Sequence, residues 1–236
     1  MRGLSLVLPG LFGPLPEVSD LPASEALLTL LARAEARDAV GADFESQLFH
    51  LFGITLTPEF DPPVAALARL ANGNPPPTRR IYGQASKLSR TMHDVRHDPV
   101  KDELIVANPF AAAILIFRGG ANGQEAPIRI IQGPKTQLSN PQRMDIHPTR
   151  RELFVPSGGG TLVFDLDANG DVAPKRVIRG PDTQGPGGSV AVDPIHNLIA
   201  TPGRNRSILI FDLMANGNVK PLRVIRGPNT QIDRIN

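Results

Sequence analysis

Short apolar runs separated by turn residues recur along residues 71–236, and none of these runs has the 3.6-residue spacing of an amphipathic helix. Glycine and proline interrupt the pattern about every ten residues, as is typical of a chain of short β-strands. The last stretch of this kind predicts four strands, at Val190–Val192, Leu198–Thr201, Ile208–Phe211 and Leu222–Ile225. Turns are predicted between them at Asp193-Pro194, at Pro202-Gly203 with Asn205, and at Asn216-Gly217.

The strand pattern belongs to an internal repeat. Ala-Asn-Gly triplets begin at residues 71, 121, 168 and 215, so successive triplets are 50, 47 and 47 residues apart. Each triplet opens a related segment: ANGNPPPTRRIYGQASKL, ANGQEAPIRIIQGPKTQL, ANGDVAPKRVIRGPDTQG and ANGNVKPLRVIRGPNTQI. Four antiparallel strands in about 47 residues are typical of one β-propeller blade. The repeat predicts three complete blades, at about 92–132, 143–179 and 189–226, with a lone leading strand at 78–82.

Turn chemistry explains the repeated residues locally. Asn-Gly tolerates the positive φ angles of tight hairpins, which predicts a hairpin between the third and fourth strands of each blade. Gly-Pro follows each complete fourth strand and is expected to end it, because proline cannot donate to a strand ladder. In Gly158-Gly159-Gly160 we expect another tight hairpin turn, since no Lys-Ser/Thr follows as a phosphate loop requires.

Residues 1–70 predict a separate α-rich segment. A first strand is expected at Leu4–Leu8. Three helices are expected after it: one opened by Asp20 and Pro22, one capped by Asp43 and closed by Gly53, and one capped by Asp61. The third helix would place Val64, Leu67 and Leu70 on one face. The fold class expected for the whole chain is therefore mainly β: a partial, open propeller of about three blades preceded by a small α-rich segment.

Composition narrows the function classes. The chain has no cysteine, which excludes disulfides, thiolate metal sites and a cysteine nucleophile. Only 5% of the residues are aromatic, which argues against stacking platforms for single-stranded nucleic acid. Residues 1–74 carry 4 Lys/Arg and 9 Asp/Glu, whereas residues 75–236 carry 21 and 14. The basic charges of the second part are interspersed with acidic ones, so we expect a solvated surface and no nucleic-acid partner.

The N-terminus only loosely imitates a secretion signal, because Pro9 interrupts its apolar run and no small-residue cleavage site follows promptly. We therefore expect a cytoplasmic protein without a membrane span.

The repeated elements ANGxxxPxRxIxGPxTQ, the Asp-Pro bend and ILIF resemble NHL-type bacterial propellers, relatives of the six-bladed gluconolactonase and regucalcin group. The resemblance covers about 165 residues and is specific for the fold. Enzymes of that group hold a divalent metal in the central channel through acidic and amide side chains from different blades. Of the residues in this sequence, Asn108 is the candidate for such a position, but its counterparts are Ser157 and Pro202, so no metal set, catalytic residue or cofactor is assigned.

Other candidate residues are weighed against structural roles. His93 and His97 are spaced as a helical metal pair would be, but in a strand they would lie about 13 Å apart, so a structural role is expected, as it is for His147. A column of arginines, namely Arg79, Arg129, Arg176 and Arg223, is expected to stabilise the blades by pairing with an Asp or by capping a carbonyl, with an anion track as the alternative. Asp98 and Asp193 are expected to shape turns.

Three blades are fewer than a closed propeller contains. We therefore expect either a truncated or fused product or closure by association of two copies. The function predicted is a non-enzymatic repeat scaffold that binds a protein or a small ligand. The alternative implied by the resemblance is a metal-dependent hydrolase or lactonase, and a fusion relic without a selected activity is a third hypothesis.

Overall fold

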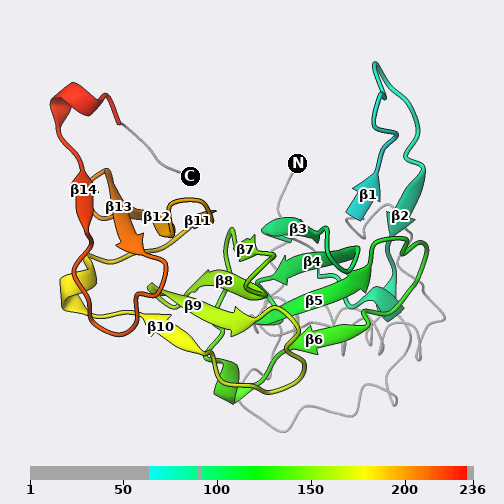
Figure 1. The fold of residues 1–236 in the computed structure, drawn as a ribbon. Coiled ribbons are helices and arrows are strands. Elements are labelled where there is room, and N and C mark those ends of the chain that lie inside the picture. Colours follow the sequence, from blue (N-terminus) through cyan, green and yellow to red (C-terminus); the bar gives the residue numbers. More distant parts are fainter. Residues whose placement is uncertain (1–63, 90–91, 233–236) are drawn as a thin grey trace, which may run out of the picture. The chain divides into compact units, whose positions relative to one another are not determined.

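The computed structural model describes residues 64–89 and 92–232, all of which belong to one compact unit, Thr57–Asn236. This part of the chain is mainly β and forms four antiparallel sheets (Figure 1). The leading sheet pairs β1 (Val64–Ala66) with β2 (Arg79–Ile81). The first full sheet contains β3 (Asp94–Asp98), β4 (Glu103–Asn108), β5 (Ala113–Arg118) and β6 (Arg129–Ile131). The second contains β7 (Asp145–His147), β8 (Glu152–Ser157), β9 (Gly160–Asp165) and β10 (Arg176–Ile178). The third contains β11 (Ala191–Asp193), β12 (Leu198–Gly203), β13 (Ser207–Asp212) and β14 (Arg223–Ile225).

The four strands predicted in the last repeat are confirmed to within two residues. One predicted turn is displaced: Asn205 lies in the turn at 204–206 with a φ of 58°, as expected, but Pro202 and Gly203 lie in β12, where they pair with Ile208 and Ser207. Proline is tolerated there because the strand is about to end and its nitrogen need not donate. The predicted turn at Gly158-Gly159 is confirmed, since both residues have positive φ (56° and 74°) and connect the paired residues at the ends of β8 and β9.

The third predicted helix is wrong for residues 64–70. Val64–Ala66 form β1, which pairs with β2 in the same register that β5 and β6 have. The alanines and leucines of this stretch favour a helix locally, but the pairing with β2 overrides that preference. The predicted strand at Leu4–Leu8 and the two earlier helices lie outside the described residues.

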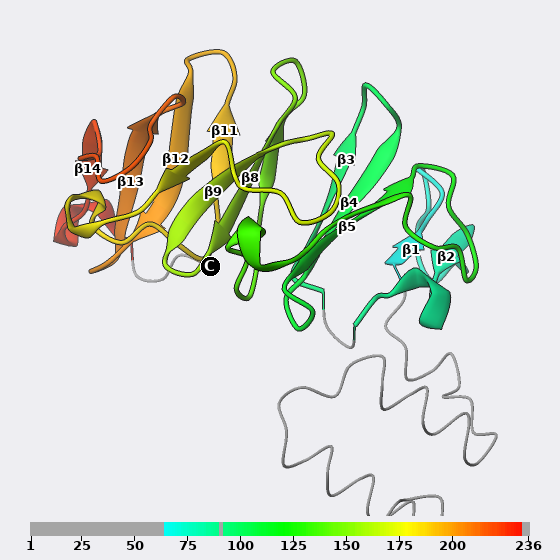
Figure 2. The ribbon, with the colours of Figure 1, turned by 90° about the horizontal axis from the view of Figure 1, so that it is seen from below.

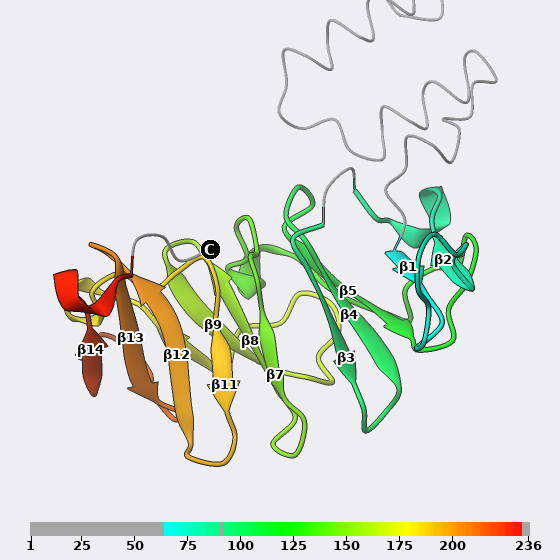
Figure 3. The ribbon, with the colours of Figure 1, turned by 90° about the horizontal axis from the view of Figure 1, so that it is seen from above.

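Alternate faces of the strands build one apolar core on each side of the second full sheet. Phe164 and Leu153 face back toward the first full sheet, where Ile105 and Ile116 meet them. The opposite face of β8, with Phe154, packs against the third full sheet. Figures 2 and 3 show the second full sheet between the first and the third. Because it is covered on both faces, β8 is buried along its whole length.

The predicted antiparallel pairing of the third and fourth strands is confirmed, but the predicted tight turn is wrong, because the triplets at 121, 168 and 215 lie in long connections that join neighbouring sheets. Ten residues separate β13 from β14, and the triplet at 215–217 lies against β10 of the preceding sheet. Asn216 Oδ1 accepts a hydrogen bond from the Val177 nitrogen at 3.1 Å, and the Gly217 nitrogen donates to the Val177 oxygen at 2.6 Å. The other two docked triplets make the same two bonds to Ile130 and Arg80. We call this arrangement the triplet latch.

Glycine makes room for the latch. The residue that follows each docked triplet packs against the glycine after the fourth strand, and a Cβ on Gly83 would lie 2.7 Å from the Gln124 side chain. Gly133 and Gly180 are covered in the same way by Asp171 and Asn218. All three glycines have positive φ, which other residues rarely adopt. As predicted, Gly-Pro then ends the strand, and a short 3₁₀ turn follows, as at Pro134–Thr136 and Pro181–Thr183.

Within the described ranges, no helix is long and apolar enough to cross a membrane.

Candidate functional site

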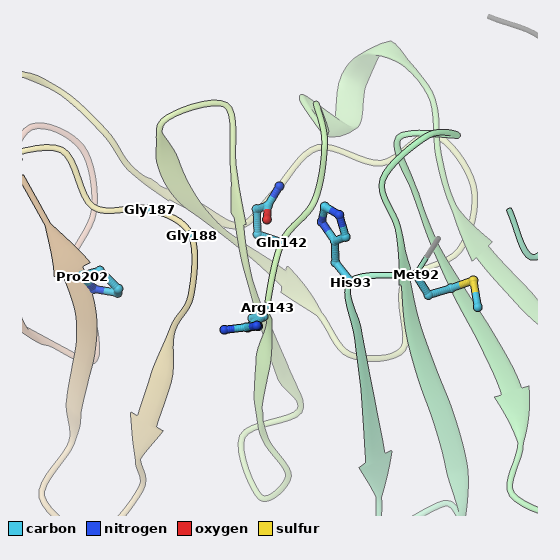
Figure 4. A pocket seen from close by; sticks show the side chains of 7 residues that line it. All are labelled: Met92, His93, Gln142, Arg143, Gly187, Gly188 and Pro202. Atoms are coloured by element: carbon cyan, nitrogen blue, oxygen red, sulfur yellow. The ribbon is translucent and has the colours of Figure 1, made fainter. Parts of the chain in front are cut away.

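A pocket of about 440 Å³ lies where the chain leads into the first strands of three successive sheets (Figure 4). Its walls come from the residues just before β3, β7 and β11, together with one residue of β12. They are Met92, His93, Gln142, Arg143, Gly187, Gly188 and Pro202. The lining therefore combines three polar side chains with exposed glycine backbone, a composition suited to a small polar ligand.

Backbone hydrogen bonds between sheets hold the pocket wall in place. Arg143 bridges to the neighbouring segment: its nitrogen donates to the Gly188 oxygen at 3.3 Å and its oxygen accepts from the Val190 nitrogen at 3.1 Å. The Gly187 nitrogen donates to the Pro202 oxygen at 3.2 Å. The two glycines thus belong to a fixed connection between the second and third full sheets, and Gly188 adopts a φ of 80° there.

His93 supplies an unused polar atom. Its backbone nitrogen donates to the Ala107 oxygen at 3.1 Å, which fixes the start of β3. Its Nδ1 atom is buried and has no hydrogen-bond partner in the described part of the chain. A buried polar atom without a partner costs free energy, so a ligand group that pairs with it would recover that cost.

Arg143 supplies the positive charge. Its side chain is exposed and makes no ion pair within residues 64–89 and 92–232. Figure 4 shows its side chain extending from the segment before β7 toward the side where Pro202 lies, while Gln142 and His93 point together to another side. An arginine with unused donors next to a histidine and an amide is an arrangement that recognises a carboxylate or phosphate.

The channel positions implied by the resemblance do not fit a metal. Both polar groups of the Asn108 side chain are hydrogen-bonded within the protein: its Nδ2 donates to the Lys87 oxygen at 2.9 Å, and its Oδ1 accepts from the Ser89 hydroxyl. Ser157 donates to the Ser139 oxygen at 2.8 Å and accepts from the Ser139 nitrogen at 2.7 Å. By strand register the third member of this column is Gly203 and not Pro202, which corrects the sequence alignment. The side chains of Asn108 and Ser157 thus fasten the segment before each first strand, at residues 87–89 and 139, to the sheet. They do not converge as ligands of one metal ion would.

The histidines considered for metal binding lie apart: His93 directly precedes β3, His97 lies in β3 and His147 ends β7. His97 pairs with Asp102 at 3.0 Å and is half exposed. His147 replaces the turn aspartate of the other sheets, and its Nδ1 accepts from the Arg150 nitrogen at 3.3 Å. Among the described residues, no three His, Asp or Glu side chains gather as a metal ion would require.

The repeated arginines cap carbonyls and pair with acidic side chains, as expected, and their nearest acidic partner is a glutamate, with Asp167 at 3.6 Å from Arg129 as a second one. Arg79 caps the Gly119 oxygen of the next sheet at 2.5 Å. Arg176 binds both carboxylate oxygens of Glu152, at 2.7 and 3.1 Å, and also the Leu213 oxygen of the next sheet at 3.2 Å. Arg129 pairs with Glu103 at 2.5 Å. Arg223 is the exception, because Leu198 stands where the other sheets have this glutamate.

The turn aspartates behave as predicted, and one has a second role. Asp193 accepts from the Ile195 and His196 nitrogens, which shapes its turn. Asp98 accepts from the Val100 nitrogen and, fully buried, also pairs with Arg151 of the neighbouring sheet at 2.5 Å. Arg151 in turn binds Asp167, and this hydrogen bond lowers the pKa of Asp167 to about 2 against the opposing effect of burial. This ion-pair network joins the first and second full sheets.

The pocket residues were not singled out from the sequence, apart from His93 and Pro202. They lie in the irregular segments between repeats, where the pattern gives no register. The sequence signal that could have found the pocket is position in the repeat, because residues 92–93, 142–143 and 187–188 each lie shortly before the first strand of a sheet.

No family model matches the amino-acid sequence, and the search of curated proteins finds no relative.

Proposed function

We propose that the sheets of Thr57–Asn236 are propeller-type blades that act as a non-enzymatic scaffold, and that the pocket beside His93 and Arg143 binds a small organic anion. The propeller assignment is supported by the 47-residue repeat, by three four-stranded antiparallel sheets in chain order, and by the contacts of β7 with both β3 and β11. In that arrangement the first strands lie innermost, which places the pocket at the inner end of the blades.

One observation carries the ligand class: the buried, unpartnered Nδ1 of His93 and the exposed guanidinium of Arg143 line the same pocket. The Arg143 guanidinium donates hydrogen bonds and carries a positive charge, and a carboxylate oxygen can accept from the His93 Nδ1 atom when that atom carries the proton, so a polar cavity lined by both favours a carboxylate. The described residues offer no nucleophile with an activating base at this pocket, since the imidazole and guanidinium stand beside an amide, a thioether and glycine backbone. The chemistry supported is therefore recognition and not turnover.

The test is binding of defined anions to the full chain. Succinate, acetate and inorganic phosphate are each titrated by calorimetry and by thermal unfolding. Binding of at least one of them with one site per chain is expected, and Arg143→Ala should weaken it about tenfold or more. Lys135→Ala is the matched control, because Lys135 is exposed and lies outside the pocket lining.

A His93→Phe variant tests the contribution of the imidazole. Loss of binding in both pocket variants with retention in the control supports the proposal. Absence of binding of all three anions, or equal loss in the Lys135 control, contradicts it.

A further inference from the structure

The third full sheet has an uncovered face. In the second full sheet every residue of β8 is buried, whereas in β12 and β13 burial alternates between buried and partly exposed positions. The partly exposed side chains, such as Ile208 and Ile210, occupy the register of Ile114 and Ile116, which are buried by the next sheet. At the fourth strand the contrast is sharper: Ile225 is 44% exposed, and its counterpart Ile178 is fully buried.

The outer edge of β14 also carries unused latch groups. Val224 pairs with Leu209 as Val177 pairs with Leu162, so its nitrogen and oxygen point away from β13 just as those of Val177 point away from β9. In the second sheet these groups bond to Asn216 and Gly217. In the third sheet no described residue takes that place, and Gly227 has nothing within 4 Å of a Cβ built on it.

The segment that matches this unoccupied edge is the first triplet. Residues 71–74 read Ala-Asn-Gly-Asn, identical to residues 215–218 of the triplet that docks on the second sheet. The unoccupied edge, residues 223–230, reads RVIRGPNT, and the occupied edge at 176–183 reads RVIRGPDT. One position differs, Asn229 in place of Asp182. Asn218 Nδ2 donates to the Asp182 carboxylate at 3.0 Å, and Asn218 Oδ1 accepts from the Asp182 backbone nitrogen at 2.8 Å. An asparagine at this position can make both bonds, because its side-chain oxygen accepts and its backbone nitrogen donates.

The first triplet is undocked in the single chain. Asn72 Oδ1 accepts from the Gly73 nitrogen of its own triplet at 2.8 Å, whereas in a docked triplet the glycine nitrogen donates to the preceding sheet. Leu67 and Leu70 beside it are 57% and 81% exposed. In the other sheets the counterpart of Leu67 is a buried phenylalanine, Phe117 or Phe164.

We propose that residues 71–74 of one copy dock on β14 and the following turn, residues 223–230, of a second copy, by the triplet latch that joins sheets within the chain. Asn72 would accept from the Val224 nitrogen, Gly73 would donate to the Val224 oxygen, and Asn74 would cover Gly227. The Arg223 guanidinium, which has no glutamate in its own sheet, would cap the Arg69 oxygen, as Arg176 caps the Leu213 oxygen. The contact is head to tail, so each copy uses two different surfaces.

Self-association of the full chain, measured by sedimentation over a range of concentrations, is the first test. Asn72→Ala and Val224→Pro should each weaken it about tenfold or more. The proline removes only a nitrogen that points outward, and edge strands tolerate it. Asn216→Ala is the matched control: it breaks an internal latch, so it should lower the stability of the fold and leave the association constant unchanged.

Mixing the variants tests the head-to-tail geometry. An Asn72→Ala copy retains the receiving edge, and a Val224→Pro copy retains the triplet, so the two together should form a dimer at a concentration where each variant alone is monomeric. Because the chain has no cysteine, Asn74→Cys in one copy and Asn229→Cys in another should give a covalent dimer on oxidation, whereas Asn74→Cys with the exposed Val100→Cys should not.

A monomer at every concentration overturns the proposal. So does association that survives both edge variants, or a complex in which a different protein occupies β14 of the intact chain. Circular dichroism of each variant at a dilution where it is monomeric confirms that the sheets remain folded. None of these readouts depends on the anion pocket.

Discussion

The side-chain oxygen of Asn169 lies 3.0 Å from the backbone nitrogen of Ile130, and this hydrogen bond joins two sheets across 39 residues of sequence. The same bond recurs at Asn122 and Asn216. A residue that favours a local turn therefore has its effect on the neighbouring repeat, which explains its recurrence at a fixed spacing better than hairpin geometry does.

Asn169→Ala should lower the free energy of unfolding by about 1 kcal/mol, because the Ile130 nitrogen loses its acceptor. Urea denaturation followed by circular dichroism measures the loss. Asn72→Ala is the control, since among the described residues the Asn72 side chain bonds to its own Gly73 and to no neighbouring sheet, and at monomeric dilution it should change stability by less than about 0.5 kcal/mol. Equal losses in the two variants would show that the asparagine acts locally.

Gly180→Ala should destabilise the protein more than Gly227→Ala does. Both glycines have positive φ, at 143° and 119°, so both variants carry a similar backbone strain. Only at Gly180 would the new Cβ overlap a side chain of the next sheet, that of Asn218. We expect a difference of about 1–3 kcal/mol in urea denaturation at monomeric dilution. If Gly227→Ala costs as much, backbone strain alone explains these glycines.

Arg176→Ala should cost about 3 kcal/mol, because it leaves the carboxylate of Glu152, only 3% exposed, without its main partner. Arg223→Ala tests the same column where no glutamate is present, and its expected cost is below about 0.5 kcal/mol. The comparison is made by chemical denaturation of the monomer. A large loss at Arg223 would contradict the assignment of the arginine effect to the glutamate pair.

The ion pair between Arg151 and Asp167 predicts a pH dependence of stability. The folded pKa of Asp167 is lowered to about 2 from its ordinary 3.8, so ionised Asp167 stabilises the fold above about pH 4. This contribution is lost as the pH falls through the folded pKa. The stability difference between the native protein and Asp167→Asn should therefore shrink from about pH 4 to about pH 2, as followed by urea denaturation at each pH. A difference that stays constant over this window would exclude Asp167 as its source.

How far the sequence predicts this structure depends on whether the deciding interaction is local. The strands of the last repeat follow directly from short apolar runs and turn chemistry, and the Asp193 turn follows from its side chain. Val64–Ala66 could not be found in this way, because alanine and leucine favour a helix and only the register with β2 selects the strand.

The candidate site illustrates the same limit. His93, Gln142 and Arg143 lie in irregular segments, and contacts between sheets bring these segments together: Arg96 bonds to the Met144 oxygen between the first and second full sheets, and Arg143 pairs with the Gly188 and Val190 backbone between the second and third. The column of Asn108 and Ser157 was identified from the sequence, but its role of fastening the connecting segment depends on partners that no spacing reveals.

Because each triplet latch connects only adjacent sheets, the protein should not open uniformly. The second full sheet is held from both sides, whereas β14 loses protection as soon as its own ladder frays. Amide hydrogens of β8 and β9 should therefore exchange with solvent most slowly, and rates should rise toward β14. A gradient of this kind would make the third full sheet the site where unfolding begins. A second copy bound at β14 would then slow amide exchange in the successive sheets.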